Sequence, residues 1–136
     1  MFMRTDLGFQ YQSVSTDAGE TWSPARPSAL ASPLSPASIK RIPGRDALLA
    51  VWNDHRNIEP ELRDKRTPLT AAVSTDGGTT WSGPLVIESD PDGWYCYTAI
   101  EFVGDRVLLA HCAGRTRQNG LNTLQITWFP LRLLLP

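Results

Sequence analysis

The most densely charged part of the sequence is residues 54–65, which carry carboxylate, guanidinium and imidazole side chains. It contains Pro60 and has no apolar stripe, so we expect a long loop, and loops on a β scaffold often carry binding and catalytic residues. The two histidines, His55 and His111, lack the spacing of a metal site. No glycine-rich phosphate-binding loop occurs in the sequence. We therefore expect neither a metal nor a cofactor.

A second set of chemically active groups is the pair Cys96 and Cys112, which flanks a hairpin expected to turn at residues 104–105. This arrangement would place the two thiols on facing strands. Two cysteines are too few for a disulfide framework, and a cross-strand disulfide would need an oxidising compartment. Because an unpaired cysteine commonly behaves as a small buried apolar residue, we expect two thiols, with the disulfide as the alternative.

The composition limits the class of protein. A chain of 136 residues suffices for one domain, and 13 basic against 14 acidic residues leave no basic field for nucleic acid. A hydrophobic content of 41% with five tryptophans indicates a folded chain. No stretch of about 18 apolar residues predicts a membrane span, and residues 1–10 lack the apolar core of a signal peptide. We therefore expect no nucleic-acid or membrane partner and, by default, a cytoplasmic location.

One sequence pattern occurs twice, and we expect it to set the arrangement of the strands that position these charged side chains and thiols. Ser-Thr-Asp-x-Gly-x-Thr-Trp fills residues 15–22 and again 74–81, with six of eight positions identical and starts 59 residues apart (74 minus 15). The aspartate can accept hydrogen bonds from a tight turn, glycine supplies a positive φ, and tryptophan fastens the turn to its sheet. Such repetition is typical of a repeat architecture. The residues assigned to these structural turns are Ser15, Asp17, Gly19, Trp22, Ser74, Asp76, Gly78 and Trp81.

The rest of the sequence predicts short strands separated by turns. Strands are expected at residues 9–14, 37–42, 47–53, 69–73, 84–87, 97–103, 106–111 and 123–129. Residues 23–36 contain four prolines, so we expect an extended connection there and not a strand. No segment predicts a long helix.

These elements predict an all-β fold. Each small sheet needs neighbours to cover its faces, and radial stacking provides them, so we expect a partial β-propeller of about two to three four-stranded antiparallel blades. The predicted single domain spans residues 4–132, with blades at residues 4–35, 36–90 and 91–132.

With its repeats placed in this way, the chain resembles the sialidase (neuraminidase) superfamily, whose repeats are called Asp boxes or BNR repeats. The likeness extends from Arg4 to Phe129, nearly the whole chain. It implies a six-bladed propeller, with Asp boxes between the third and fourth strands of several blades. This chain is similar to the C-terminal part of such a propeller.

The resemblance also implies a carbohydrate site. Members of the family bind the sugar carboxylate with three arginines and use a Tyr/Glu nucleophile pair and an Asp acid/base. Arg66 matches the third arginine because it precedes Ser74 by the same eight positions (74 minus 66). Its planar guanidinium is suited to binding a carboxylate. The alternative is that Arg66 is one of several solvated basic residues on a loop. Asn53 and Asp54 would lie beside the substrate pocket.

Tyr97 matches the family nucleophile. A phenol is unreactive at its usual pKa of about 10 and needs a neighbouring carboxylate as base. The alternative is that Tyr97 packs in an aromatic cluster with Trp94 and Tyr95.

The sequence departs from the family pattern at the second arginine. Gln10 occupies the matching position and cannot carry a positive charge, while Arg4 falls in a different column of the match. The first arginine, the Asp acid/base and the Glu partner would lie before Met1.

Three functions therefore remain open. The first is a sialidase-like glycoside-hydrolase fragment that lacks full activity alone. The second is a self-assembling partial propeller that binds carbohydrate or acts as a structural module, since exposed blade edges favour homo-oligomers. The third is an intact, active hydrolase in which a partner chain supplies the residues that complete a catalytic site with Arg66 and Tyr97.

Overall fold

The computed structural model describes residues 1–135, which are built mainly of strands and turns. The strands are β1 (Phe2–Met3), β2 (Phe9–Gln12), β3 (Arg26–Ala31), β4 (Ser38–Arg41), β5 (Leu48–Trp52), β6 (Leu69–Ser74), β7 (Leu85–Glu88), β8 (Gly93–Val103), β9 (Arg106–Arg115) and β10 (Leu124–Pro130). Within the described residues, three single-turn 3-10 helices accompany them: η1 (Pro60–Leu62), η2 (Thr116–Gln118) and η3 (Leu131–Leu133). Over residues 1–135, no helix has the length and apolar character needed to cross a bilayer.

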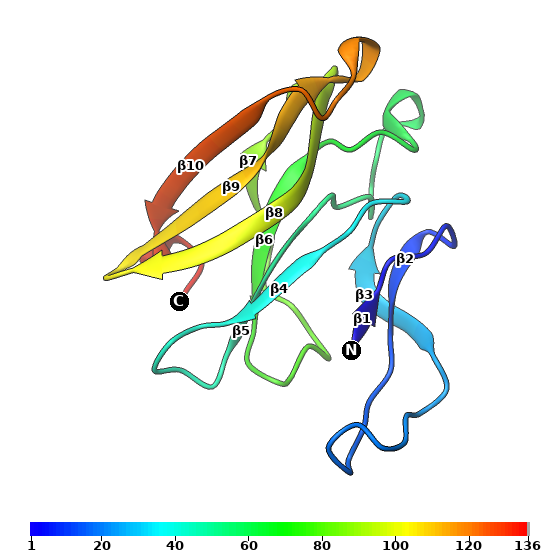
Figure 1. The fold of residues 1–136 in the computed structure, drawn as a ribbon, viewed down its shortest axis with the longest axis vertical. Coiled ribbons are helices and arrows are strands. Elements are labelled where there is room, and N and C mark those ends of the chain that lie inside the picture. Colours follow the sequence, from blue (N-terminus) through cyan, green and yellow to red (C-terminus); the bar gives the residue numbers. More distant parts are fainter. Residues whose placement is uncertain (136) are drawn as a thin grey trace.

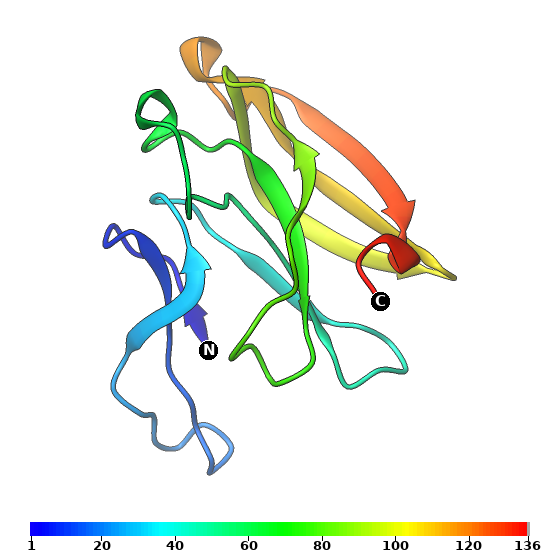
Figure 2. The same ribbon diagram turned by 180° about the vertical axis from the view of Figure 1, so that it is seen from behind.

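The strands form three antiparallel sheets in chain order (Figure 1). The N-terminal sheet has the order β1-β2-β3, the middle sheet β4-β5-β6-β7, and the C-terminal sheet β10-β9-β8. Figure 2 shows from behind that the middle sheet lies between the other two. The predicted all-β, antiparallel fold is confirmed.

The middle sheet is packed on both faces, which explains why its central strands are apolar without alternation. All six residues of β6 are buried. On one face Val51 packs in a core shared with Leu109 of the C-terminal sheet. On the other face Trp52 packs with Leu30 of the N-terminal sheet. Burial of this apolar surface holds the three sheets together.

The repeated turn at residues 74–81 connects β6 to β7, the third and fourth strands of the middle sheet. The Asp76 carboxylate accepts hydrogen bonds from the N–H and hydroxyl of Thr80 and from the hydroxyl of Ser74. Asp17 is held in the same way by Thr21 and Ser15. These donors lower the pKa of both carboxyl groups to about 2. Both carboxylates therefore stabilise the turns in which they lie.

The structure corrects the prediction for residues 23–36. Arg26–Ala31 forms β3, although this segment contains Pro27. Proline is tolerated here because β3 is an edge strand, where a missing N–H need not break a ladder. Strands β8 and β9 are also longer than expected and pair as far as Gly93 and Arg115.

Candidate functional site

The most unusual backbone in the C-terminal sheet is at Tyr97. The pairing of β8 with β9 is regular up to Cys96 and resumes at Ala99, so residues 97–98 form an irregularity of the bulge type. Tyr97 has φ 54°, a left-handed conformation that is unfavourable for a bulky side chain. Its side chain is exposed, with 51% of its surface accessible. Such strain is frequently found at functional positions.

Neighbouring elements hold this bulge in place. The Ser38 hydroxyl in β4 donates to the carbonyl oxygen of Thr98, and Lys40 Nζ donates to the carbonyl oxygen of Ile100 at 2.9 Å. These bonds join the middle sheet to β8 just beyond Tyr97. The orientation of the tyrosine is therefore set by two sheets.

Two arginines lie beside the Tyr97 phenol. The guanidinium carbon of Arg66 is 5.3 Å from the centre of the Tyr97 ring and 4.9 Å from the Trp94 ring. The pKa of Tyr97 is below its usual value because Arg66 and then Arg4 stabilise the phenolate. The structure thus brings together two predicted residues, Arg66 and Tyr97, and adds Arg4.

Arg66 is fixed from its backbone and from its side chain. Its carbonyl oxygen accepts a hydrogen bond from the N–H of Tyr95 at 2.9 Å, which ties the end of the charged loop to β8. Its guanidinium donates to the carbonyl oxygen of Leu34 at 3.4 Å. Neither bond uses a carboxylate, so the charge of Arg66 remains available to an anionic ligand.

A cavity of about 570 Å³ opens next to Arg66. Its polar and aromatic lining includes Asp6, His55, Arg63, Asp64, Arg66 and Trp94. His55 Nε2 donates to the carbonyl oxygen of Thr67 at 3.1 Å, and burial lowers the pKa of this imidazole. The neutral imidazole is therefore a polar, uncharged part of the cavity lining.

Asn53 is buried at the end of β5 and bonded to the protein itself. Its side chain, 1% exposed, donates to the carbonyl oxygens of Pro68 at 3.0 Å and Tyr95 at 3.1 Å. Its carbonyl oxygen accepts the hydroxyl of Ser35 at 2.6 Å. In this arrangement Asn53 joins segments that lie next to the site and has no group free for a ligand.

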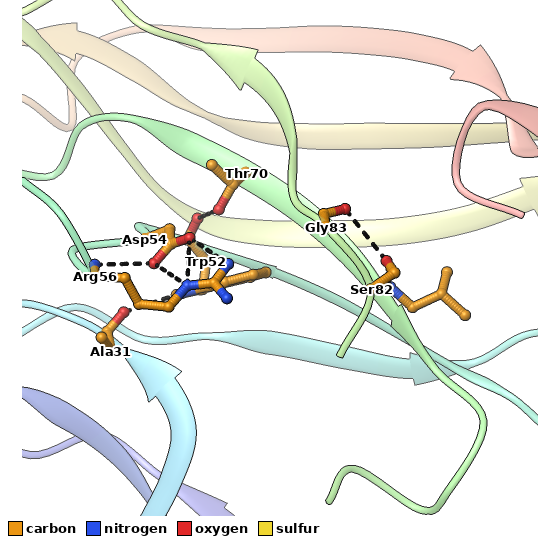
Figure 3. A network of polar contacts seen from close by, with 8 residues as sticks. Ala31, Trp52, Asp54, Arg56, Thr70, Ser82 and Gly83 are labelled. Atoms are coloured by element: carbon orange, nitrogen blue, oxygen red, sulfur yellow. Dashed lines mark hydrogen bonds and ion pairs between the residues drawn. The ribbon is translucent and has the colours of Figure 1, made fainter. Parts of the chain in front are cut away.

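Asp54 belongs to a different part of the surface. Its carboxylate forms a two-pronged ion pair with Arg56, with Arg56 Nη2 at 2.7 Å, and also accepts the Arg56 N–H (Figure 3). This hydrogen-bonded pair raises the pKa of Arg56. Asp54 and Arg56 line a separate cavity of about 400 Å³ together with Thr70 and Val86. Asp54 is thus not brought to the Tyr97 phenol.

Gln10 is also placed away from the phenol. It is 1% exposed, and its amide donates to the hydroxyl of Ser32 at 2.8 Å and the carbonyl oxygen of Ser35 at 2.7 Å. Arg4, six positions earlier (10 minus 4), is the N-terminal residue beside Tyr97. The family pattern did not identify Arg4, because Arg4 does not align with the second arginine of that pattern. In the fold, the chain turns at residues 5–8 before β2 begins.

Over residues 1–135, the groups gathered around Tyr97 are cationic and aromatic. No group of three His, Cys, Asp or Glu side chains that could hold a metal ion occurs in this range. The groups that alter the pKa of Tyr97 are Arg66, Arg4 and Cys96, and no carboxylate of the described chain is among them. The arrangement can bind an anion against aromatic rings, but it presents no base to the phenol.

The fold and this site define a protein of stacked antiparallel sheets with repeated aspartate turns. The family model of the BNR repeat-like domain matches residues 1–109, and the chain belongs to this family. The resemblance to the sialidase superfamily is thereby confirmed. No curated protein matches the chain.

Solved structures show the same fold. The intramolecular trans-sialidase from Ruminococcus gnavus, in complex with oseltamivir carboxylate, superposes with a TM-score of 0.70 at 19% identity. The leech intramolecular trans-sialidase, complexed with 2,7-anhydro-Neu5Ac, gives 0.72 at 14% identity. The match covers 98% of this chain in both comparisons, but only 30% and 22% of those proteins. The chain thus spans less than a third of each relative.

Proposed function

We propose that this chain binds the carboxylate of an acidic sugar with Arg66 and Arg4, against the rings of Tyr97 and Trp94. The observation that carries the proposal is the geometry of Tyr97, held in a left-handed conformation with the guanidinium carbon of Arg66 5.3 Å from its ring centre. Arg66 and Arg4 together also lower the pKa of this phenol. An arginine can donate two parallel hydrogen bonds to a carboxylate, and aromatic rings can pack against the apolar face of a sugar. The adjacent cavity of about 570 Å³ has room for a monosaccharide.

The relatives support an acidic sugar as the ligand class. One trans-sialidase was solved with oseltamivir carboxylate and the other with 2,7-anhydro-Neu5Ac, both of which carry a carboxylate. The proposal extends only this shared chemistry to the present chain.

Binding without turnover is the expected activity of the isolated chain. A tyrosine nucleophile needs a carboxylate base, and the described residues provide none at Tyr97. The pKa of Tyr97 is lowered by hydrogen bonding to Arg66 and then Arg4 and by the charge of Arg66; these groups favour the phenolate but cannot accept its proton. Tyr97 is therefore proposed as a nucleophile candidate that needs further groups, as in a glycoside-hydrolase fragment.

Calorimetric titration with N-acetylneuraminic acid tests this proposal. Hydrogen bonds between charged groups contribute about 1.5–3 kcal/mol, so Arg66→Ala is expected to weaken binding at least about tenfold. Arg41→Ala is the matched control, because Arg41 pairs with Asp46 on an exposed hairpin and should leave affinity unchanged. Equal affinity in Arg66→Ala and the parent chain would refute the proposed role.

Self-association is a second candidate function. Leu124, Ile126 and Trp128 are exposed on the outward face of β10, which is also the free edge of its sheet. An apolar face beside an unpaired edge favours pairing with another copy. Light scattering should then give a discrete oligomer that Ile126→Glu returns to a monomer, whereas a monomeric parent chain would contradict this candidate.

A further inference from the structure

Cys96 and Cys112 are free thiols on directly opposed residues of β8 and β9. In an antiparallel pair, opposed Cα atoms lie about 4.5 or 5.5 Å apart, depending on the type of pair. Both distances fall within the range of roughly 4.4–6.8 Å that disulfides span. Opposed side chains also leave the same face of the sheet. The strand pairing therefore places the two cysteines, as opposed residues, within the Cα separation that a disulfide spans.

The two thiols have different surroundings. Cys96 is buried, with 1% of its surface exposed, whereas Cys112 is partly accessible. Burial raises the pKa of the Cys96 thiol, the guanidinium of Arg66 lowers it, and the adjacent Cys112 thiol raises it again. One thiol can thus meet an oxidant in solution, while the other is sheltered beside it. This is the arrangement of a reactive cysteine with a resolving partner.

Their place in the fold gives the pair a consequence for the site. Cys96 precedes Tyr97 and belongs to the last regular pair before the bulge. A covalent link at this pair would tie the start of the bulge to β9. The Arg66 guanidinium, which lowers the pKa of Cys96, also lies 5.3 Å from the centre of the Tyr97 ring, so the link would form beside both residues of the site.

We propose that Cys96 and Cys112 form a reversible cross-strand disulfide that stiffens the bulge carrying Tyr97. The oxidant is hydrogen peroxide. The Cys112 thiolate attacks the O–O bond, which gives a sulfenic acid at Cys112 and releases water once the leaving oxygen takes a proton. The Cys96 sulfur then attacks the Cys112 sulfur, the S–O bond breaks, and hydroxide leaves as water with the Cys96 proton. Two thiols and one hydrogen peroxide thus yield one disulfide and two water molecules.

Treatment of the full chain with hydrogen peroxide, followed by dithiothreitol, tests the chemistry. Accessible thiols in the unfolded protein should fall from two per chain to none and return on reduction, because the sequence contains two cysteines. Mass spectrometry should show a monomer lighter by two hydrogen atoms, with a peptide that joins Cys96 to Cys112. Disulfide-linked dimers alone, or sulfinic acid at Cys112 with Cys96 unchanged, would overturn the proposal.

Amide hydrogen exchange tests the effect on the bulge. Exchange at residues 96–99 should slow in the oxidised chain and recover on reduction, whereas the turn at residues 74–81 should stay unchanged. Cys112→Ala removes the partner thiol and should abolish the response to peroxide. Equal exchange at residues 96–99 in the oxidised and reduced chains would overturn the stiffening role. Neither experiment uses a sugar, so its outcome is independent of the proposed binding function.

Discussion

Asn53 provides a quantitative test of how the site is held together. The Asn53→Ala change removes three hydrogen bonds, to Ser35, Pro68 and Tyr95. Each contributes about 0.5–1.5 kcal/mol net, and a buried carbonyl left without its donor costs a further ~1–3 kcal/mol. Some of these costs overlap, so we expect a loss of about 3–5 kcal/mol in the free energy of unfolding. Ser35→Ala removes one of the bonds and should cost about 1–2 kcal/mol.

Urea denaturation followed by tryptophan fluorescence measures these differences. With a slope of about 2 kcal/mol per molar urea, Asn53→Ala should lower the midpoint by about 2 M. Asn57→Ala is the matched control, since Asn57 is exposed and should change stability by less than about 0.5 kcal/mol. A loss below about 1 kcal/mol in Asn53→Ala would refute the reasoning and return Asn53 to the ligand-binding candidates.

Three further predictions concern the turns and the aromatic wall of the site. Asp17 and Asp76 have a folded-state pKa near 2 against an ordinary 3.8, so their stabilisation is complete above pH 3.8 and is lost as the pH falls toward 2. An acid-unfolding titration should show this loss of stability, and the loss should be smaller in Asp76→Asn. Gly78→Ala should destabilise the chain by about 1 kcal/mol more than Gly77→Ala, because the new Cβ would meet a phenylalanine ring atom at 2.8 Å, whereas the space at Gly77 is open. Thermal melts compare them, and equal melting temperatures would contradict the predicted contact. Trp94→Ala should weaken sugar binding about two- to fivefold in calorimetry, since it removes a ring stacked on the site arginine.

The sequence predicted the fold well where local patterns decide it. Alternating apolar residues and turn residues predicted nearly all the longer strands. Strand β3 was missed because the exclusion of proline applies to central strands, and nothing local marks residues 26–31 as an edge. The two-residue strand β1 is too short to carry a pattern.

The candidate site could be predicted only in part. The resemblance to the sialidase superfamily indicated Arg66 and Tyr97, which lie together in the structure. Arg4 was missed because its approach to Tyr97 depends on how the N-terminal sheet packs, which sequence spacing does not record. The left-handed backbone of Tyr97 was equally unpredictable, because it arises from pairing with β9 and bracing by β4.

The central claim, that Arg4, Arg66 and Tyr97 form an anionic-sugar site, is tested most directly by chemical-shift mapping. Addition of N-acetylneuraminic acid to the isotope-labelled chain should shift the amide signals around residues 66 and 97. Arg66→Ala should strongly reduce these shifts at the same sugar concentration, and lactose, which lacks a carboxylate, should not produce them. Shifts confined to the Asp54–Arg56 cavity, or no shifts at all, would contradict the account.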